Sequence, residues 1–222
     1  MNHSTLVSIG VITYNSGKYV LETLESIRNQ TYSNLELIIS DDFSTDDTVV
    51  KCKKWINENS KRFAKVKIIE TEKNTGIPSN INRAVQNSQG EWYKGIAGDD
   101  LLLPDAIEKY VDYVSLHNDA QLVFARMFAF YERDGKVVEE PYVDISKKDV
   151  ELFNNQSPYE QYVELLKDKS KSGGAPTAFA KRELFLKYPY NELYKGFDDV
   201  PQWIRLTRNG VHLNMMNDYT VK

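Results

Sequence analysis

Pairs of adjacent aspartates recur in this chain next to apolar runs. Asp41-Asp42 follows LELIIS, Asp99-Asp100 follows YKGIAG, and Asp198-Asp199 precedes VPQWIRL. Two carboxylates in contact repel by roughly 4 kcal/mol at an effective dielectric constant near 20, so each pair needs a cation, hydrogen-bond donors or exposure to water. With three scattered histidines and one cysteine in the chain, the acids favour a hard divalent cation, Mg²⁺ or Mn²⁺, which often shares its coordination with phosphate.

Other residues suit a nucleotide base and a proton transfer. Tyr14 and Asp42 follow neighbouring predicted strands, and a tyrosine ring there could stack on a base. A carboxylate accepts the imide N–H of uracil better than any group of cytosine, whose N3 is itself an acceptor. Asp198-Asp199 could supply a general base for an incoming hydroxyl. The G-x-x-x-x-G-K-[ST] and G-x-G-x-x-G phosphate loops are missing from the sequence, which disfavours kinases, P-loop NTPases and dinucleotide dehydrogenases.

Alternating strands and helices over the first 118 residues would bring Thr13-Tyr14-Asn15, Asp41-Asp42 and Asp99-Asp100 to one edge of a sheet. Apolar, β-branched runs predict strands over 6–14, 35–42, 64–70 and 91–98, and helical spacing predicts helices over 18–30, 43–60, 79–90 and 102–118. Ser44 is expected to cap the second helix and Gly90 to close the third. The short loops indicate an α/β fold, in which a mostly parallel sheet carries helices on both faces. Ligands of such sheets bind beyond the carboxyl ends of the strands, where the strand order reverses.

The pattern changes after Asn118. Residues 121–140 read as two strands about the turn dipeptide Asp134-Gly135, and 141–156 show no clear period and predict a mobile loop. An amphipathic helix is predicted over 158–168. A glycine-containing loop, a short strand and a short helix follow over 170–188, and a last helix over 196–210. Trp203 within that helix is expected to pack in the core.

Composition excludes several classes of protein. The chain has 222 residues and a net charge of −4, without a basic block, which argues against a nucleic-acid partner. A single cysteine, Cys52, permits no disulfide framework and fits a reducing compartment. The first residues have no positive n-region of a signal peptide, and no run approaches the ~18 apolar residues that span a bilayer. These features predict a cytoplasmic protein.

The order and spacing of several segments resemble glycosyltransferase family 2, which has the GT-A fold. The resemblance rests on VSIGVITYN, SIRNQTYSNLELIISDDFSTDDT, NTG and NRAVQNSQGEWYKGIAGDDLLLPD, and resumes more weakly at SGGAPTAFAKRELF and GFDDVPQWIRL. It implies an inverting, metal-dependent transfer of a sugar from a nucleotide donor, with UDP favoured, to an acceptor hydroxyl. Residues 1–118 would form the nucleotide-sugar-binding half, and 119–222 the acceptor-side half of the same domain.

The resemblance also implies roles for individual residues. Tyr14 and Asp42 would face the base and Asp99 the ribose, and Asp100 would ligate Mn²⁺ or Mg²⁺. Asp199 would act as the base that takes the acceptor's proton. The implied nucleotide-binding set is Thr13, Tyr14, Asn15, Asp42, Gly76 and Asp99. The implied partners are a nucleotide-sugar donor and a saccharide or lipid-linked saccharide acceptor of bacterial surface polysaccharide, such as capsule, with peripheral association at the inner face of the membrane.

The chain departs from the family pattern at three places. Ala97 stands where members often carry another acid, Asp198-Asp199 where they often carry Glu-Asp, and the chain stops at Lys222, so we expect a C-terminally shortened member. Two other functions stay open. A nucleotidyltransferase would need a glycine-rich basic loop in place of TYNSGKY, and a non-catalytic sugar-nucleotide-binding module would be insensitive to Asp199→Asn.

Overall fold

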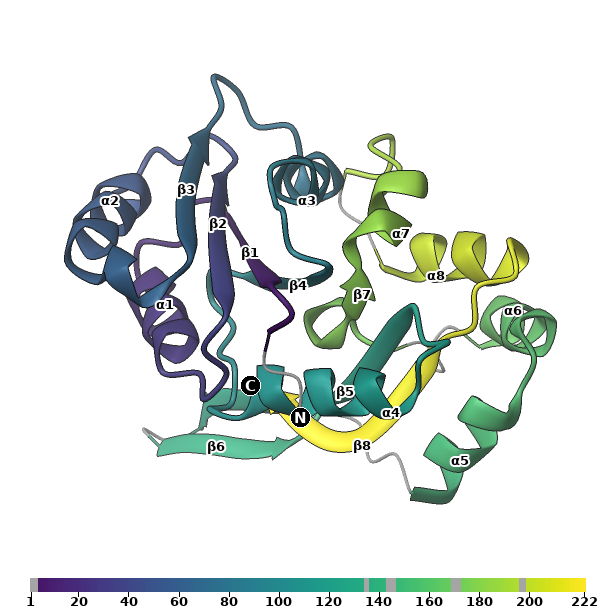
Figure 1. The fold of residues 1–222 in the computed structure, drawn as a ribbon. Helices are drawn as coiled ribbons and strands as arrows, with labels where there is room; N and C mark the ends of the chain where they lie inside the picture. The colour runs from purple at the N-terminus through teal and green to yellow at the C-terminus, as the bar shows by residue number, and fades with distance from the viewer. Residues whose placement is uncertain (1–3, 134–135, 143–146, 169–172, 196–198) are drawn as a thin grey trace.

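A single mixed sheet forms the centre of the computed structural model, which describes residues 4–133, 136–142, 147–168, 173–195 and 199–222 (Figure 1). In this described part the order is β3-β2-β1-β4-β7-β5-β6, and β8 pairs with β5. The strands are β1 Val7–Thr13, β2 Leu35–Asp41, β3 Lys65–Glu70, β4 Trp92–Ala97, β5 Leu122–Arg133, β6 Lys136–Pro141, β7 Phe179–Lys181 and β8 Asn214–Val221.

The first four strands are parallel, as predicted, and the later strands are mixed. β1 pairs with β2 and β4, and β2 with β3, all in parallel. β7 runs antiparallel to β4 and β5, and β6 antiparallel to β5, whereas β8 is parallel to β5. The chain moves outward from β1 to β3 and then returns to the other side of β1 with β4. The strand order therefore reverses between β1 and β4, the position where such sheets bind ligands.

Helices cover both faces of the sheet, because alternate side chains of the central strands enter two separate cores. Leu35, Leu37 and Ile39 of β2 belong to one core and Ile38 to the other. α1 Val20–Arg28, α2 Thr48–Asn59 and α4 Ala106–Leu116 contribute to the first core. The second core receives α3 Ile77–Gln86, α5 Lys147–Asn155, α6 Pro158–Lys167, α7 Arg182–Lys187 and α8 Asp199–Arg208. Trp203 is fully buried there, so the prediction that it packs in the core is confirmed.

Two predicted helix ends are wrong, and hydrogen bonding explains both. The second helix begins at Thr48, not after Ser44, because the Ser44 hydroxyl donates to Asp41 Oδ2 at 2.6 Å. The third helix ends at Gln86, before Gly90. The backbone N–H of Gly90 donates to Ser8 Oγ at 2.8 Å, and a Cβ at Gly90 would lie 2.6 Å from the Ser8 nitrogen. This glycine is needed for close approach to β1.

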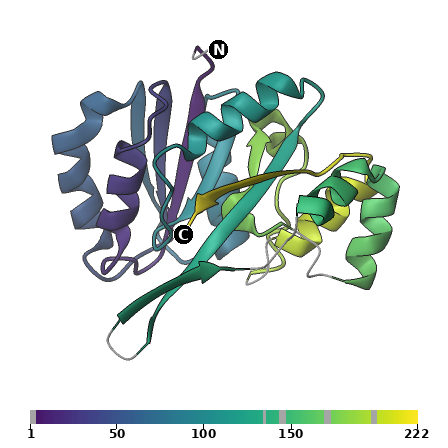
Figure 2. The ribbon, with the colours of Figure 1, turned by 90° about the horizontal axis from the view of Figure 1, so that it is seen from below.

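Two elements escaped prediction. α5 lies in the segment expected to be a mobile loop. It is mostly polar and fully buries only Val150, and Asn154 exchanges two 2.8 Å hydrogen bonds with the Met215 backbone. The sequence predicted no element over Asn214–Val221, which forms β8. It runs along β5, while the β5–β6 hairpin extends away from the body (Figure 2). The antiparallel β5–β6 pairing confirms the predicted hairpin, although its turn residues 134–135 lie outside the described residues.

The last strand also holds the segment that follows the central acid pair. The Lys222 N–H donates to the Leu101 carbonyl at 2.8 Å, and the Leu103 N–H donates to the Thr220 carbonyl at 2.8 Å. Residues next to Asp100 are thus tied to residues some 120 positions later in the sequence.

Candidate functional site

Hydrogen bonds join the ends of β1 and β2 into one edge, which we call the rim. The Asp42 N–H donates to the Thr13 carbonyl at 2.9 Å, and the Thr13 hydroxyl donates to Asp41 Oδ2 at 2.7 Å. Asn80 of α3 donates from its side chain to the same Thr13 carbonyl at 3.3 Å. Thr13 and Asp42 are therefore adjacent, as the parallel register predicted.

Asp42 is buried and fully hydrogen-bonded. Its carboxylate accepts from the Thr75 N–H (2.9 Å), the Thr75 hydroxyl (2.6 Å) and the Gly76 N–H (2.7 Å). The guanidinium of Arg83 lies 3.2 Å from the same group. A carboxylate offers about four lone-pair positions, and all four are taken. Asp42 thus fixes the turn at Gly76, whose φ of +92° favours glycine. To accept a base N–H, Asp42 would have to release one of these donors.

Two exposed aromatic rings stand beside this turn. Tyr14 is 52% exposed and Phe43 is 46% exposed, so neither is a core aromatic. Asn15 and Phe43 both have positive φ, 51° and 72°. Asn15 accepts from the Thr45 N–H at 2.8 Å, which helps to hold this conformation. A bulky residue such as Phe43 in the left-handed region is strained, and such strain is most often found at binding sites.

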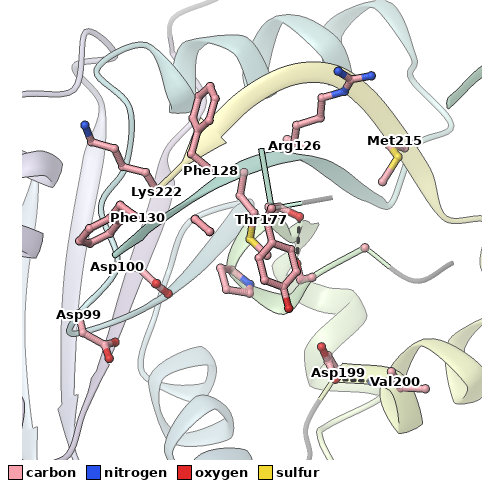
Figure 3. A pocket seen from close by; sticks show the side chains of 17 residues that line it. Asp99, Asp100, Arg126, Phe128, Phe130, Thr177, Asp199, Val200, Met215 and Lys222 are labelled. Carbon is pink, nitrogen blue, oxygen red and sulfur yellow. Dashed lines mark hydrogen bonds between the residues drawn. The ribbon is translucent and has the colours of Figure 1, made fainter. Parts of the chain in front are cut away.

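The second part of the site is a pocket of about 690 Å³ that contains three of the predicted acids. Asp99 and Asp100 lie on one side of it and Asp199 on the other, with Thr177 between (Figure 3). Most of the remaining lining comes from β5 and the 173–177 segment, and the rest from α8, β8 and the residues that follow β6 and β8: Ala125, Arg126, Met127, Phe128, Ala129, Phe130, Tyr142, Gly173, Gly174, Pro176, Val200, Met215 and Lys222. Asp199 Oδ1 accepts from the Val200 N–H at 2.7 Å at the start of α8, and Asp198 lies outside the described residues.

The pKa values of Asp100, in this pocket, and of the buried Lys94 behind it are strongly perturbed. Burial, and then the neighbouring charge of Asp99, raise the pKa of Asp100 to about 6, although Lys94 acts in the opposite direction. Burial lowers the pKa of Lys94 to about 7, and Asp100 opposes that shift. Perturbed pairs of this kind in a cavity mark candidate functional sites.

A smaller, mostly apolar pocket of about 250 Å³ adjoins the first and shares Asp100, Pro176 and Asp199 with it. Isoleucines of β1, α3 and β4 line it, together with Phe185 of α7. Tyr93 also lines this pocket, and its buried hydroxyl has no hydrogen-bond partner among the described residues. Burial raises the pKa of Tyr93. An unpaired hydroxyl in an apolar site is costly, which makes this pocket a candidate subsite for a ligand that carries a polar group.

The described residues offer only two protein ligands, Asp99 and Asp100, for the predicted metal ion. Among the described residues there is no group of three or more His, Cys, Asp and Glu side chains that could hold an ion. Asp99 and Asp100 are adjacent carboxylates. A bound cation would offset the repulsion between them and the cost of burying the charge of Asp100. The donor set fits Mg²⁺ or Mn²⁺ if a diphosphate supplies further oxygens, as these ions commonly require.

Sequence reasoning missed four residues of the site. Thr75 and Arg83 hold Asp42, Phe43 stands beside it, and Lys94 lies behind the acid pair. A lysine within the apolar run WYKGIA was a visible signal for Lys94. The others gave no signal, because their roles depend on contacts between separate segments.

Comparisons with known proteins identify the family and the fold of the chain. The model of the family described as glycosyl transferase family 2 matches residues 8–188. An uncharacterized glycosyltransferase of Haemophilus influenzae is 29% identical over 203 residues, which cover 90% of this chain and 61% of the relative. The crystal structure of S. aureus TarS 1-349 in complex with UDP superimposes with a TM-score of 0.71 at 21% identity, over 97% of this chain and 59% of that one.

A second solved structure, a mannosyltransferase of Pyrobaculum calidifontis in complex with GDP-Man and Mn²⁺, gives a TM-score of 0.70 at 19% identity, over 97% of this chain and 56% of that one. At these identities the likeness establishes the fold. The chain spans about three fifths of the length of these proteins. No helix in the described part of the chain is both long and apolar enough to cross a membrane.

Proposed function

The chain belongs to glycosyl transferase family 2, and we propose that it transfers a sugar, with inversion, from a UDP-linked donor to a hydroxyl of a saccharide acceptor. The observation that carries this proposal is the shared pocket of Asp99, Asp100 and Asp199. These acids come from segments a hundred residues apart, yet they face one cavity. A pocket with an acid pair that could hold a cation and diphosphate on one side, and the Asp199 carboxylate on the other, suits displacement at a sugar carbon.

The nucleoside of the donor would lie along the rim. The exposed ring of Tyr14 offers a stacking surface, and Asn15 and Gly76 shape the turns on either side. Asp42 would contact the base directly or, with its acceptor positions filled, through the Gly76 turn that it holds. Asp99, at the end of β4, would contact the ribose. TarS is described in complex with UDP, which supports uridine as the base.

The sugar of the donor would occupy the smaller pocket between Asp100 and Asp199. That pocket has apolar walls and the Tyr93 hydroxyl as a free hydrogen-bonding group. The acceptor would enter through the larger pocket, where Phe128 and Phe130 present ring surface to a saccharide. An acceptor hydroxyl is a much weaker acid than a carboxylic acid, so Asp199 would take its proton as the new bond forms, not before. One displacement inverts the configuration of the sugar carbon.

A divalent cation would be held by Asp100 together with the phosphates. When bound, it supplies Lewis-acid stabilisation of the charge that develops on the leaving diphosphate. The mannosyltransferase described with GDP-Man and Mn²⁺ supports this choice of cofactor. We further propose that the acceptor belongs to a bacterial surface polysaccharide, free or lipid-linked, and that the protein works in the cytoplasm, at the inner face of the membrane.

A thermal-shift screen of nucleotides, with and without Mn²⁺, tests the binding half of the proposal. UDP with Mn²⁺ should raise the melting temperature selectively, and Asp100→Ala should abolish the effect. Asp218→Ala, at an exposed aspartate of β8, is the matched control and should behave as the wild type does. An equal response to all nucleotides with no effect of the cation would contradict the proposal.

A further inference from the structure

Lys94 is a buried cation in the centre of the sheet. It lies on β4 and none of its surface is exposed. Its Nζ donates to its neighbour's carbonyl, that of Gly95, at 2.7 Å and to the carbonyl of Pro176. Of the ion pairs among the described residues, none involves Lys94. Removing an ammonium group from water costs several kcal/mol, and two carbonyls return only part of that.

The position of Lys94 connects it to the acids of the pocket. Pro176, whose carbonyl accepts from Lys94, lines both cavities together with Asp100 and Asp199. Lys94 is also the charged group that acts on Asp100 against the effects of burial and of Asp99. The ammonium group of Lys94 therefore lies behind the pocket wall, by which we mean the lining formed by Pro176, Asp99 and Asp100.

Hydrogen bonding alone does not explain a lysine at this position, because a neutral amide could satisfy the same two carbonyls. What lysine adds is a covalently held ammonium, whose charged form is favoured by negative charge in front of it. The wall in front of it contains Asp99 and Asp100, and Ala97 adds no third acid. A nucleoside diphosphate bound there would bring more negative charge to a region where water is scarce.

We propose that the Lys94 ammonium acts as a second cation of the diphosphate site, beside the divalent ion. It would offset the charge of the donor's phosphates through the pocket wall and would hold Pro176 in place by its hydrogen bond. The proposal rests on the proposed function of the pocket. Lys94 touches no substrate, so it is a positioning residue whose charge acts across the wall. A divalent cation and Lys94 would share the neutralisation of the diphosphate.

Two variants separate the charge of Lys94 from its hydrogen bonds. Lys94→Gln keeps donors for both carbonyls without the charge, and Lys94→Met removes both. Lys181→Met, on the neighbouring strand β7, changes the net charge of the protein equally and is the matched control. The affinities for UDP and for uridine would be measured by calorimetry in EDTA and again in saturating Mn²⁺.

Both Lys94 variants should bind UDP about tenfold more weakly than the wild type in EDTA, with uridine affinity unchanged. The loss should shrink in Mn²⁺, because the metal replaces part of the missing charge, and Mn²⁺ alone should bind the variants more tightly than the wild type. A lysine with a purely structural role would not tighten the binding of a cation. Lys181→Met should match the wild type.

The proposal is overturned if Lys94→Gln binds UDP in EDTA within twofold of the wild type, or if uridine and UDP affinities fall together. A wild-type protein that binds no UDP would instead refute the proposed function itself. If Lys94→Met fails to fold, the charge of Lys94 is tested by urea unfolding of Lys94→Gln, with and without Asp100→Asn. Asp100→Asn should then raise the folding equilibrium constant at least about threefold more in Lys94→Gln than in the wild type, and equal gains would overturn the proposal.

Discussion

The substitution Asp100→Asn should make the metal-free protein more stable. The carboxylate of Asp100 is largely buried beside Asp99, and its pKa rises from 3.8 to about 6. A difference of about two pH units, at 1.36 kcal/mol per unit, corresponds to roughly 3 kcal/mol at most. Water at the partly exposed edge of the side chain reduces this, so we expect a gain of about 1–3 kcal/mol. For a chain of this length that is about 2–12 °C in melting temperature.

The gain should depend on pH in one direction. Because the pKa of Asp100 in the folded protein is above its value in the unfolded chain, the folded state binds more protons between pH 3.8 and about 6. The cost of the ionised carboxylate is therefore complete above pH 6, decreases as the pH falls and is absent below about 4. The advantage of Asp100→Asn over the wild type should follow the same course.

Urea unfolding in EDTA at pH 7.5 and at pH 4 measures both expectations. Asp218→Asn, an exposed aspartate, is the control and should change stability by less than about 0.5 kcal/mol. If Asp100→Asn were no more stable than the wild type at pH 7.5, or equally favoured at both pH values, the reasoning about its burial would be refuted.

Three further predictions follow from the site. Asp199→Asn should lower turnover by about 10²–10⁴-fold while UDP binding stays within twofold, measured by transfer assay and calorimetry; unchanged turnover would exclude it as the base. Tyr93→Phe should raise the free energy of unfolding by about 1 kcal/mol, because it removes a buried unpaired hydroxyl, and should weaken donor binding; a loss of stability would show that the hydroxyl has a partner. Asp42→Ala should cost about 3 kcal/mol in urea unfolding, because it removes the acceptor of the Thr75 N–H and the carboxylate that balances the charge of Arg83; a cost below 1 kcal/mol would contradict this role.

Sequence patterns predicted the parallel half of the molecule well. β1 and β2 are buried on both faces, so their apolar runs were unambiguous, and the GT-A-type fold is confirmed by the solved structures that match. Asp99, Asp100 and Asp199 share a pocket, which the sequence could suggest only through the resemblance. Of the nucleotide-binding set, Thr13, Asp42 and Gly76 are linked through hydrogen bonds.

The second half was harder to predict for physical reasons. α5 is mostly polar and fully buries only Val150, and β8 has a mixed burial pattern because it pairs with a single strand. The filled acceptor positions of Asp42 and the burial of Lys94 depend on residues far away in the sequence. Such relations follow from packing, and local patterns contain little information about them.

The bonds that join Leu101 and Leu103 to the last strand have a consequence for the order of assembly. As the chain is synthesised, β1 to β4 can associate early, because all four strands lie before Gly98 in the sequence. The segment beside the acid pair must wait for residues 214–222 to emerge and settle alongside β5. Contacts of such long sequence separation form late and slow the search for the native state. A nascent chain would thus build its scaffold first and complete the pocket of the acid pair only after β8 has emerged.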